Sequence, residues 1–275
     1  MRITRFTSTS LRQRVSMPGR GGFTIAELVA VVSIIAILVS LLSAALNSTK
    51  SKALRITCLD NVRQLQIAWQ AYAEENGDVL PLNQTAPVPN KRGVIANRLS
   101  DDSWVRGNPL YDLTTTNIEW GSLFPYVRSS SVYRCPMDDS TVYGHPDALR
   151  TRSYSIDAYL GGDSNLGRPP KMRLGELANQ AANVFVFIEE DQNEGFAQSS
   201  FVVVPKTISS IAGSWVSKPA DRHSRGCNIS FADGHIEYWR WYGQRSSSDS
   251  AGAQLSAAST HEDPDIRRLQ SCIPQ

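Results

Sequence analysis

The stretch FTIAELVAVVSIIAILVSLLSAAL, residues 23–46, decides how this chain folds. As a helix that rises about 1.5 Å per residue it reaches about 36 Å, more than the roughly 30 Å hydrocarbon core of a bilayer. Its single charged residue is Glu27, and a carboxylate inside a bilayer costs about 2.5 to 3.5 kcal/mol. The stretch therefore predicts a transmembrane helix in which one carboxylate has a specific role.

The residues on either side of this run predict its orientation. Residues 1–22 contain five arginines and no acidic residue, which is the layout of a targeting segment whose positive flank stays in the cytoplasm. The run is too long for the core of an ordinary signal peptide, and no small-x-small cleavage site follows it. We therefore expect a single-pass membrane protein with a cytoplasmic leader and everything after Leu46 outside the cytoplasm.

The helix continues beyond the apolar run. Gly77 is placed for a C-terminal cap, and up to that point apolar side chains recur every three or four residues, namely at Leu54, Cys58, Val62, Leu65, Trp69 and Tyr72. We expect one helix over residues 23–76, apolar all round in its transmembrane part, 23–46, and amphipathic afterwards.

The rest of the chain has the composition of an ordinary globular protein, with 41% hydrophobic and 20% charged residues. The net charge of +2 argues neither for nor against nucleic acid, and we expect no nucleic-acid partner. Residues 184–188 and 201–204 favour short strands, and 174–181 a short helix or a turn. Residues 80–121, rich in Pro, Asn, Asp and Gly, favour a loop.

A hairpin is predicted over residues 227–242. Asp233-Gly234 is a two-residue type I′ turn signal between an alternating segment, 227–232, and an aromatic-rich one, 235–242. Antiparallel strands packed on the amphipathic half of a long helix give an α+β fold. We expect the globular domain to span 77–242, followed by a Ser/Ala-rich tail over 243–275.

The start of the helix resembles a known processing site. Gly22-Phe23-Thr24-Ile25-Ala26-Glu27 is similar to the cleavage and methylation motif of type IV prepilins and type II secretion pseudopilins. The resemblance implies that a prepilin peptidase cuts after Gly22 and that Phe23 is then methylated. It also implies that Glu27 pairs with the N-terminal amine of a neighbouring subunit as the helices pack into a filament.

The family resemblance implies the rest of the biology as well. The chain would be a pilin-like structural subunit in a bacterial inner membrane, without enzymatic activity, and its partners would be the peptidase/N-methylase and other pseudopilins. The alternative is a membrane-anchored binding module that uses the prepilin route for export and does not polymerise. The two differ in assembly, because only the first forms multimers of the processed chain.

A second resemblance lies near the C-terminus. His223, nine residues, then Asp233-Gly234 is similar to a C-terminal segment of prepilin-like proteins of planctomycetes and verrucomicrobia. Segments around Cys58 and Cys135 resemble the same group, which favours a Cys58–Cys135 disulfide and, for the remaining pair, Cys227–Cys272. Four cysteines in an exported domain are consistent with bridges, and free thiols remain the alternative.

Two metal sites are weighed on the residues alone. His223, Cys227, Asp233, His235 and Glu237 lie close in sequence but have no zinc-ligand spacing, so we favour a turn made by Asp233 and a loop hydrogen bond made by His223. The acidic run of Glu189, Glu190, Asp191 and Glu194 offers the oxygen ligands that calcium prefers, against the simpler interpretation of a solvated acidic turn. No other cofactor is expected.

Overall fold

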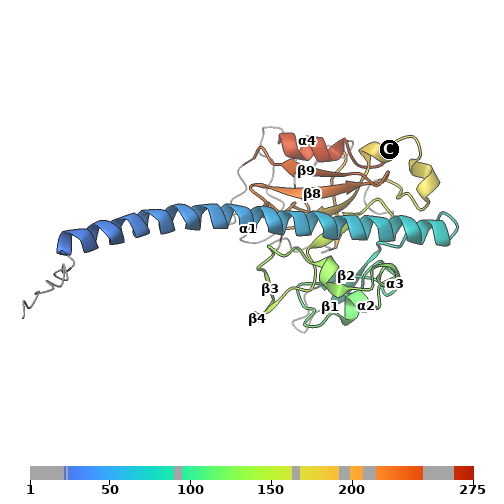
Figure 1. Cartoon of the computed structure of the whole chain (residues 1–275). Coiled ribbons are helices and arrows are strands. Elements are labelled where there is room, and N and C mark those ends of the chain that lie inside the picture. The colour runs from blue at the N-terminus through green and yellow to red at the C-terminus, as the bar shows by residue number, and fades with distance from the viewer. Residues whose placement is uncertain are drawn as a thin grey trace, which may run out of the picture. The chain divides into compact units, whose positions relative to one another are not determined.

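The computed structural model describes residues 22, 24–89, 95–162, 168–191, 199–206, 215–243 and 263–275 (Figure 1). The chain divides into two compact units, Met1–Thr49 and Lys50–Gln275. The boundary falls inside the first helix, so the amphipathic half of that helix belongs to the same unit as all the strands.

Helix α1 (Ile25–Glu75) confirms the long N-terminal helix, although Phe23 lies outside the described residues. It begins with a capping box: the backbone N–H and the hydroxyl of Thr24 both donate to the Glu27 carboxylate at 2.9 Å, and the Glu27 N–H donates to Thr24 Oγ1 at 3.2 Å. It ends at Glu75, and the φ of +66° at Gly77 lets the Asp78 N–H turn back to the Ala73 carbonyl. Glu27 therefore has a local role in starting the helix, which the apolar pattern alone does not reveal.

Residues Ile25–Ser43 of α1 form the one helix in the described part of the chain that is long and apolar enough to cross a membrane. Every side chain of this segment is exposed, with large apolar ones from 47% exposed at Val31 to 82% at Ile25. Exposure of so large an apolar surface to water is unfavourable. We therefore expect the segment to be buried in lipid or against protein.

The second unit is built on a five-stranded sheet. Its strands, in spatial order, are β7 (Ser200–Phe201), β5 (Tyr154–Asp157), β6 (Phe185–Glu189), β8 (Gly226–Phe231) and β9 (Ile236–Arg240). The α+β class is confirmed, but the sheet is mixed, because β7 pairs parallel to β5 while the other neighbours pair antiparallel. The long connection from β5 through β6 to β7 permits this parallel pairing, which no local pattern predicts.

Two cores lie against this sheet. The first joins one face of α1, including Leu65 and Trp69, to Phe187 of β6. The second takes alternate residues of β8, including Cys227 and Ile229, and therefore lies on one face of the sheet. Helix α4 (Pro264–Gln270) contributes to this second core, and Figure 1 shows it beside β9.

The last residues of the chain, 263–275, pack against the core, although we expected them to belong to a tail. Ile266 and Leu269 of α4 and Ile273 after it are at most 4% exposed. Asp263 caps the helix by accepting the Asp265 N–H at 2.8 Å. The Ser/Ala-rich composition of residues 243–275 obscures this short amphipathic helix, and residues 244–262 lie outside the described residues.

The loop expected over 80–121 contains more regular structure than its composition indicates. It holds a hairpin of β1 (Thr85–Pro89) and β2 (Ile95–Leu99) and the short helix α2 (Thr116–Glu119). After it come α3 (Phe124–Val127), η1 (Ser130–Tyr133) and a second hairpin, β3 (Thr141–Val142) with β4 (His145–Leu149). Residues 174–183 form two 3-10 turns, η2 (Leu174–Leu177) and η3 (Ala181–Asn183).

The predicted β8–β9 hairpin is confirmed, but its turn is not type I′. A type I′ turn needs positive φ at both central residues, and among the described residues only Gly234 of the Asp233-Gly234 pair has one, at +97°. The Gly234 N–H donates to the Phe231 carbonyl at 2.9 Å, and the Phe231 N–H donates to the His235 carbonyl at 3.0 Å. The loop is thus three residues long, with the glycine in the position that a G1 bulge requires.

Candidate functional site

The predicted processing residues lie at the start of the described helix. Gly22 is exposed, Phe23 lies outside the described residues, and Glu27 belongs to the first turn of α1. A Cβ atom added at Gly22 would meet nothing within 4 Å.

A second group of functional side chains is buried in the Lys50–Gln275 unit. Cys58, Cys135, Glu189 and His223 each place one donor atom in a common space, where the four atoms lie within 4.8 Å of one another. All four residues are at most 1% exposed. We refer to these four residues as the Cys-Cys-Glu-His cluster.

Each member of the cluster comes from a different element. Cys58 lies on the buried face of α1, and Glu189 is the last residue of β6. Cys135 follows η1, where its N–H donates to Ser153 Oγ at 3.1 Å. His223 precedes β8 in a tight turn, which its N–H closes by donating to the Gly226 carbonyl at 3.1 Å.

The contacts inside the cluster are short. The Cys58 thiol donates to Glu189 Oε1 at 2.8 Å, and His223 Nε2 lies 3.1 Å from the same oxygen. His223 Nε2 also lies 3.3 Å from Cys135 Sγ. A soft sulfur pair, an imidazole and a carboxylate form a donor set with which proteins hold transition metals.

Charge is distributed unevenly over the cluster. Burial lowers the pKa of His223, but its hydrogen bonds to Cys135 and Glu189 outweigh burial and raise the pKa to about 9. Burial likewise raises the pKa of Glu189, but His223, Arg222 and Cys58 together bring it below its ordinary value. With the pKa of His223 raised and that of Glu189 lowered, the cluster contains an imidazolium–carboxylate pair when no metal is bound.

Two neighbouring side chains make polar contacts with the cluster. The Tyr154 hydroxyl donates to Cys58 Sγ at 3.2 Å, and the Arg222 guanidinium lies 3.9 Å from Glu189 Oε2. His223 Nδ1 is buried and has no hydrogen-bond partner among the described residues. The cluster is thus closed to solvent and held by its own members and these two neighbours.

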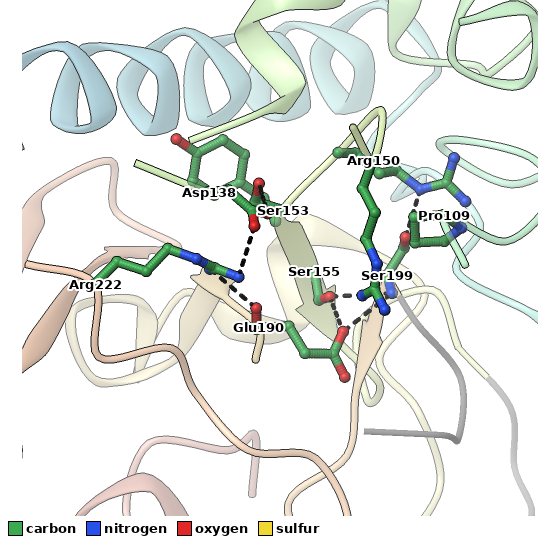
Figure 2. Close-up of a pocket in the computed structure, with 10 residues that line it drawn as sticks. Pro109, Asp138, Arg150, Ser153, Ser155, Glu190, Ser199 and Arg222 are labelled. Carbon is green, nitrogen blue, oxygen red and sulfur yellow. Dashed lines mark hydrogen bonds and ion pairs between the residues drawn. The ribbon is translucent and has the colours of Figure 1, made fainter. Parts of the chain in front are cut away.

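A small pocket adjoins the cluster through Tyr154 and Arg222 (Figure 2). Arg222 Nη2 lies 3.2 Å from Asp138 Oδ1, and its Nη1 donates to the Glu190 carbonyl at 3.1 Å. The Glu190 carboxylate accepts hydrogen bonds from Ser155 Oγ and from the Ser199 N–H. The charged groups that line the pocket therefore have partners in the protein.

Neither predicted disulfide is formed in this structure, because none of the four cysteines is bonded to another. Cys58 and Cys135 do lie close together, as a Cys58–Cys135 disulfide would require. Their thiols instead contact Glu189 and His223. Cys227 and Cys272 are buried in the second core and are not members of the Cys-Cys-Glu-His cluster.

The predicted calcium ligands do not come together. Glu189 belongs to the cluster and Glu190 to the adjoining pocket, because successive strand residues point to opposite sides. Asp191 follows them, with its N–H donating to the Lys218 carbonyl, and Glu194 lies outside the described residues. The first two residues of the run, Glu189 and Glu190, are buried, so this part of it is not a solvated turn.

The zinc constellation weighed around His223 is also separated. Asp233, His235 and Glu237 lie at the exposed turn and on β9, where Asp233 Oδ1 is 2.5 Å from His235 Nδ1. His223 instead turns inward, and its partners are a carboxylate and a thiol rather than the predicted loop. Cluster members are 77, 54 and 34 positions apart along the chain, so no local spacing identifies them.

A scan of the sequence against protein-family models returns no match. Searches of the curated proteins and of the solved structures return none either. The function is therefore argued from the residues themselves.

Proposed function

We propose that this chain is a pseudopilin-like structural subunit of a pilin-like fold, processed after Gly22 and assembled through the N-terminal half of α1. The observation that carries the proposal is the fully exposed apolar segment Ile25–Ser43, which follows a glycine-phenylalanine pair and contains one carboxylate. Its 19 residues cover about 28 Å as a helix, enough for the hydrocarbon core of a thin bilayer.

The exposed segment supports assembly as well as insertion. A simple anchor needs only an apolar surface, and a charge in it is a cost. Cleavage after Gly22 creates an α-amino group four residues before Glu27. Its positive charge can neutralise the negative charge of the Glu27 carboxylate on a neighbouring subunit. Such a pair would remove both charges from lipid and fix the axial register between subunits.

The second unit supports the same proposal. The amphipathic continuation of α1 is packed into an α+β unit, and the apolar segment belongs to the same uninterrupted helix, Ile25–Glu75. A rigid helix is the element through which subunits can stack side by side.

The maturation test is the intact mass of the protein purified from a membrane fraction of a host that contains a prepilin peptidase. We expect loss of residues 1–22 and an N-terminal, methylated Phe23. Gly22→Leu should block the cut, because the peptidase must approach the backbone closely at that position, and Gly21→Leu is the matched control that should be processed. A native chain that retains residues 1–22, or one cut elsewhere, contradicts the proposal.

A further inference from the structure

We propose that Cys58, Cys135, Glu189 and His223 are the four ligands of a structural zinc ion in the Lys50–Gln275 unit. This inference is independent of the filament proposal, because none of these residues belongs to the apolar segment or to the processing motif.

The geometry of the cluster fits a tetrahedral ion. Zinc–ligand bonds of about 2.0 to 2.3 Å place the donor atoms of a tetrahedron roughly 3.3 to 3.8 Å apart. Three of the donor pairs are closer than or at the lower end of this range: 2.8 Å for Cys58 Sγ to Glu189 Oε1, 3.1 Å for His223 Nε2 to that oxygen and 3.3 Å for His223 Nε2 to Cys135 Sγ. The remaining pairs lie within 4.8 Å of one another. The donors therefore need to move outward in the close pairs, and inward in any pair wider than about 3.8 Å, to form a tetrahedron around the ion.

The donor types select zinc over the common hard cations. Calcium and magnesium prefer sets of oxygen ligands, whereas the cluster offers two sulfurs, one nitrogen and one oxygen. Four protein ligands fill a tetrahedral shell, and all four side chains are buried. A closed shell without room for water or substrate is the arrangement of a structural zinc site rather than a catalytic one.

The charge that a bound ion would leave in the cluster has a cationic neighbour, Arg222, which also pairs with Asp138. Two thiolates and one carboxylate around a divalent cation leave one negative charge, which faces the Arg222 guanidinium 3.9 Å from Glu189 Oε2. The Tyr154 hydroxyl donates to Cys58 Sγ at 3.2 Å, the kind of outer hydrogen bond that orients and stabilises a metal-bound thiolate.

The position of the cluster indicates what the ion would do. Its ligands come from α1, the segment after η1, the end of β6 and the turn before β8. An ion bound by all four joins the amphipathic half of α1 to the sheet across long stretches of sequence. Metal binding would then contribute directly to folding of this unit.

A disulfide between Cys58 and Cys135 is the competing use of the same thiols. It would leave Glu189 and His223 as an ion pair with no metal. Oxidation and zinc binding exclude each other, because both require the two sulfurs, so a single sample can be assayed for the two outcomes.

The first experiment measures metal content in the full-length chain, purified in detergent without chelator and without a histidine tag. We expect about one zinc per chain. Cys135→Ser and His223→Gln should weaken zinc binding by more than about 100-fold, because changes in outer-shell partners alone cost up to that factor. Cys227→Ser and His235→Gln are the matched controls, since both residues lie outside the cluster, and these variants should retain the metal.

A second measurement does not depend on the variants folding. Zinc is removed from the wild-type chain with a chelator under reducing conditions and is replaced by cobalt(II). Tetrahedral thiolate coordination should give intense visible d–d bands and a near-ultraviolet sulfur-to-cobalt band. The proposal is overturned if wild-type protein, after zinc has been supplied, binds less than about a tenth of an equivalent of zinc per chain. A Cys58–Cys135 disulfide in that sample overturns it as well. Equal loss of zinc in Cys135→Ser and Cys227→Ser would overturn it too.

Discussion

Asp157, on β5, is a fully buried carboxyl group whose Oδ1 accepts the Tyr159 N–H at 3.1 Å. Its Oδ2 has no hydrogen-bond partner among the described residues. Burial raises the pKa of Asp157 well above the ordinary value of 3.8, against smaller opposing effects of that hydrogen bond and of Arg168. The folded state therefore binds a proton at this position more tightly than the unfolded state.

The sign of the resulting pH dependence follows from linkage. The contribution of Asp157 to stability is fully present below pH 3.8 and is lost as the pH rises through the raised pKa. Asp157→Asn removes the charge while keeping an oxygen for the Tyr159 N–H. We expect the variant to unfold at higher urea concentration than wild type near neutral pH, and at a similar concentration in acid.

The measurement is urea unfolding followed by tryptophan fluorescence, on wild type and variant in the same detergent across that pH range. Asp233→Asn is the control, because Asp233 is exposed at the β8–β9 turn. A difference between Asp157→Asn and wild type that is independent of pH would show that Asp157 does not titrate with folding.

Individual site residues were only partly predictable from the sequence. The motif at Gly22 and Glu27 is local, so its residues could be named, although the capping box with Thr24 shows a second role for the carboxylate. Cys58 and Cys135 could be paired only through family resemblance. Their contact with Glu189 and His223 depends on tertiary packing, which no sequence spacing encodes.

At the scale of elements, periodicity identified what is local. The helix over 25–75, strand β6 and the β8–β9 hairpin follow from repeats of three to four and of two residues. The parallel pairing of β7 and the packing of α4 depend on contacts distant in sequence. Composition was misleading in the Ser/Ala-rich and Pro/Asn-rich segments, where the short helices α4 and α2 bury Leu269 and Ile118 in the two cores.

The turn that places His223 depends on close approach of the β8 and β9 backbones. A Cβ atom on Gly226 would lie 2.1 Å from the Trp239 carbonyl oxygen, and that backbone is held in the sheet. Gly226→Ala should therefore destabilise the protein by about 3 kcal/mol or more, since overpacking against a fixed backbone is not relieved by a rotamer change.

Gly144 is the matched comparison, in the turn between β3 and β4. Its φ is +77°, but a Cβ atom there would meet nothing within 4 Å. Gly144→Ala should cost only about 1 to 2 kcal/mol, the cost of a left-handed conformation. Urea midpoints of the two variants test the order, and equal destabilisation would show that the contact at Gly226 is relieved by strand movement.

At the scale of the whole molecule, Glu27 has two separable functions. It accepts the Thr24 N–H within its own helix, and under the proposed function its charge pairs with the N-terminal amine of a neighbour. The first function needs only an acceptor, since Gln also serves in a capping box. The second function needs a negative charge, and this difference allows one set of variants to distinguish them.

We expect Glu27→Gln to retain the helix cap and lose assembly nearly as completely as Glu27→Ala, because neither side chain neutralises an ammonium in lipid. Glu27→Asp should be intermediate, since it keeps the charge on a shorter side chain. Thr24→Ala is the matched control: it removes a cap worth about 1 kcal/mol but leaves the carboxylate, so it should assemble. All four variants should still be processed and inserted.

The readout is the fraction of the processed chain trapped as multimers by cross-linking in intact cells at equal expression. If Thr24→Ala fails like Glu27→Ala while Glu27→Gln assembles, Glu27 acts only as a cap; if every variant and wild type remain monomeric, the chain is a membrane-anchored module and not a filament subunit.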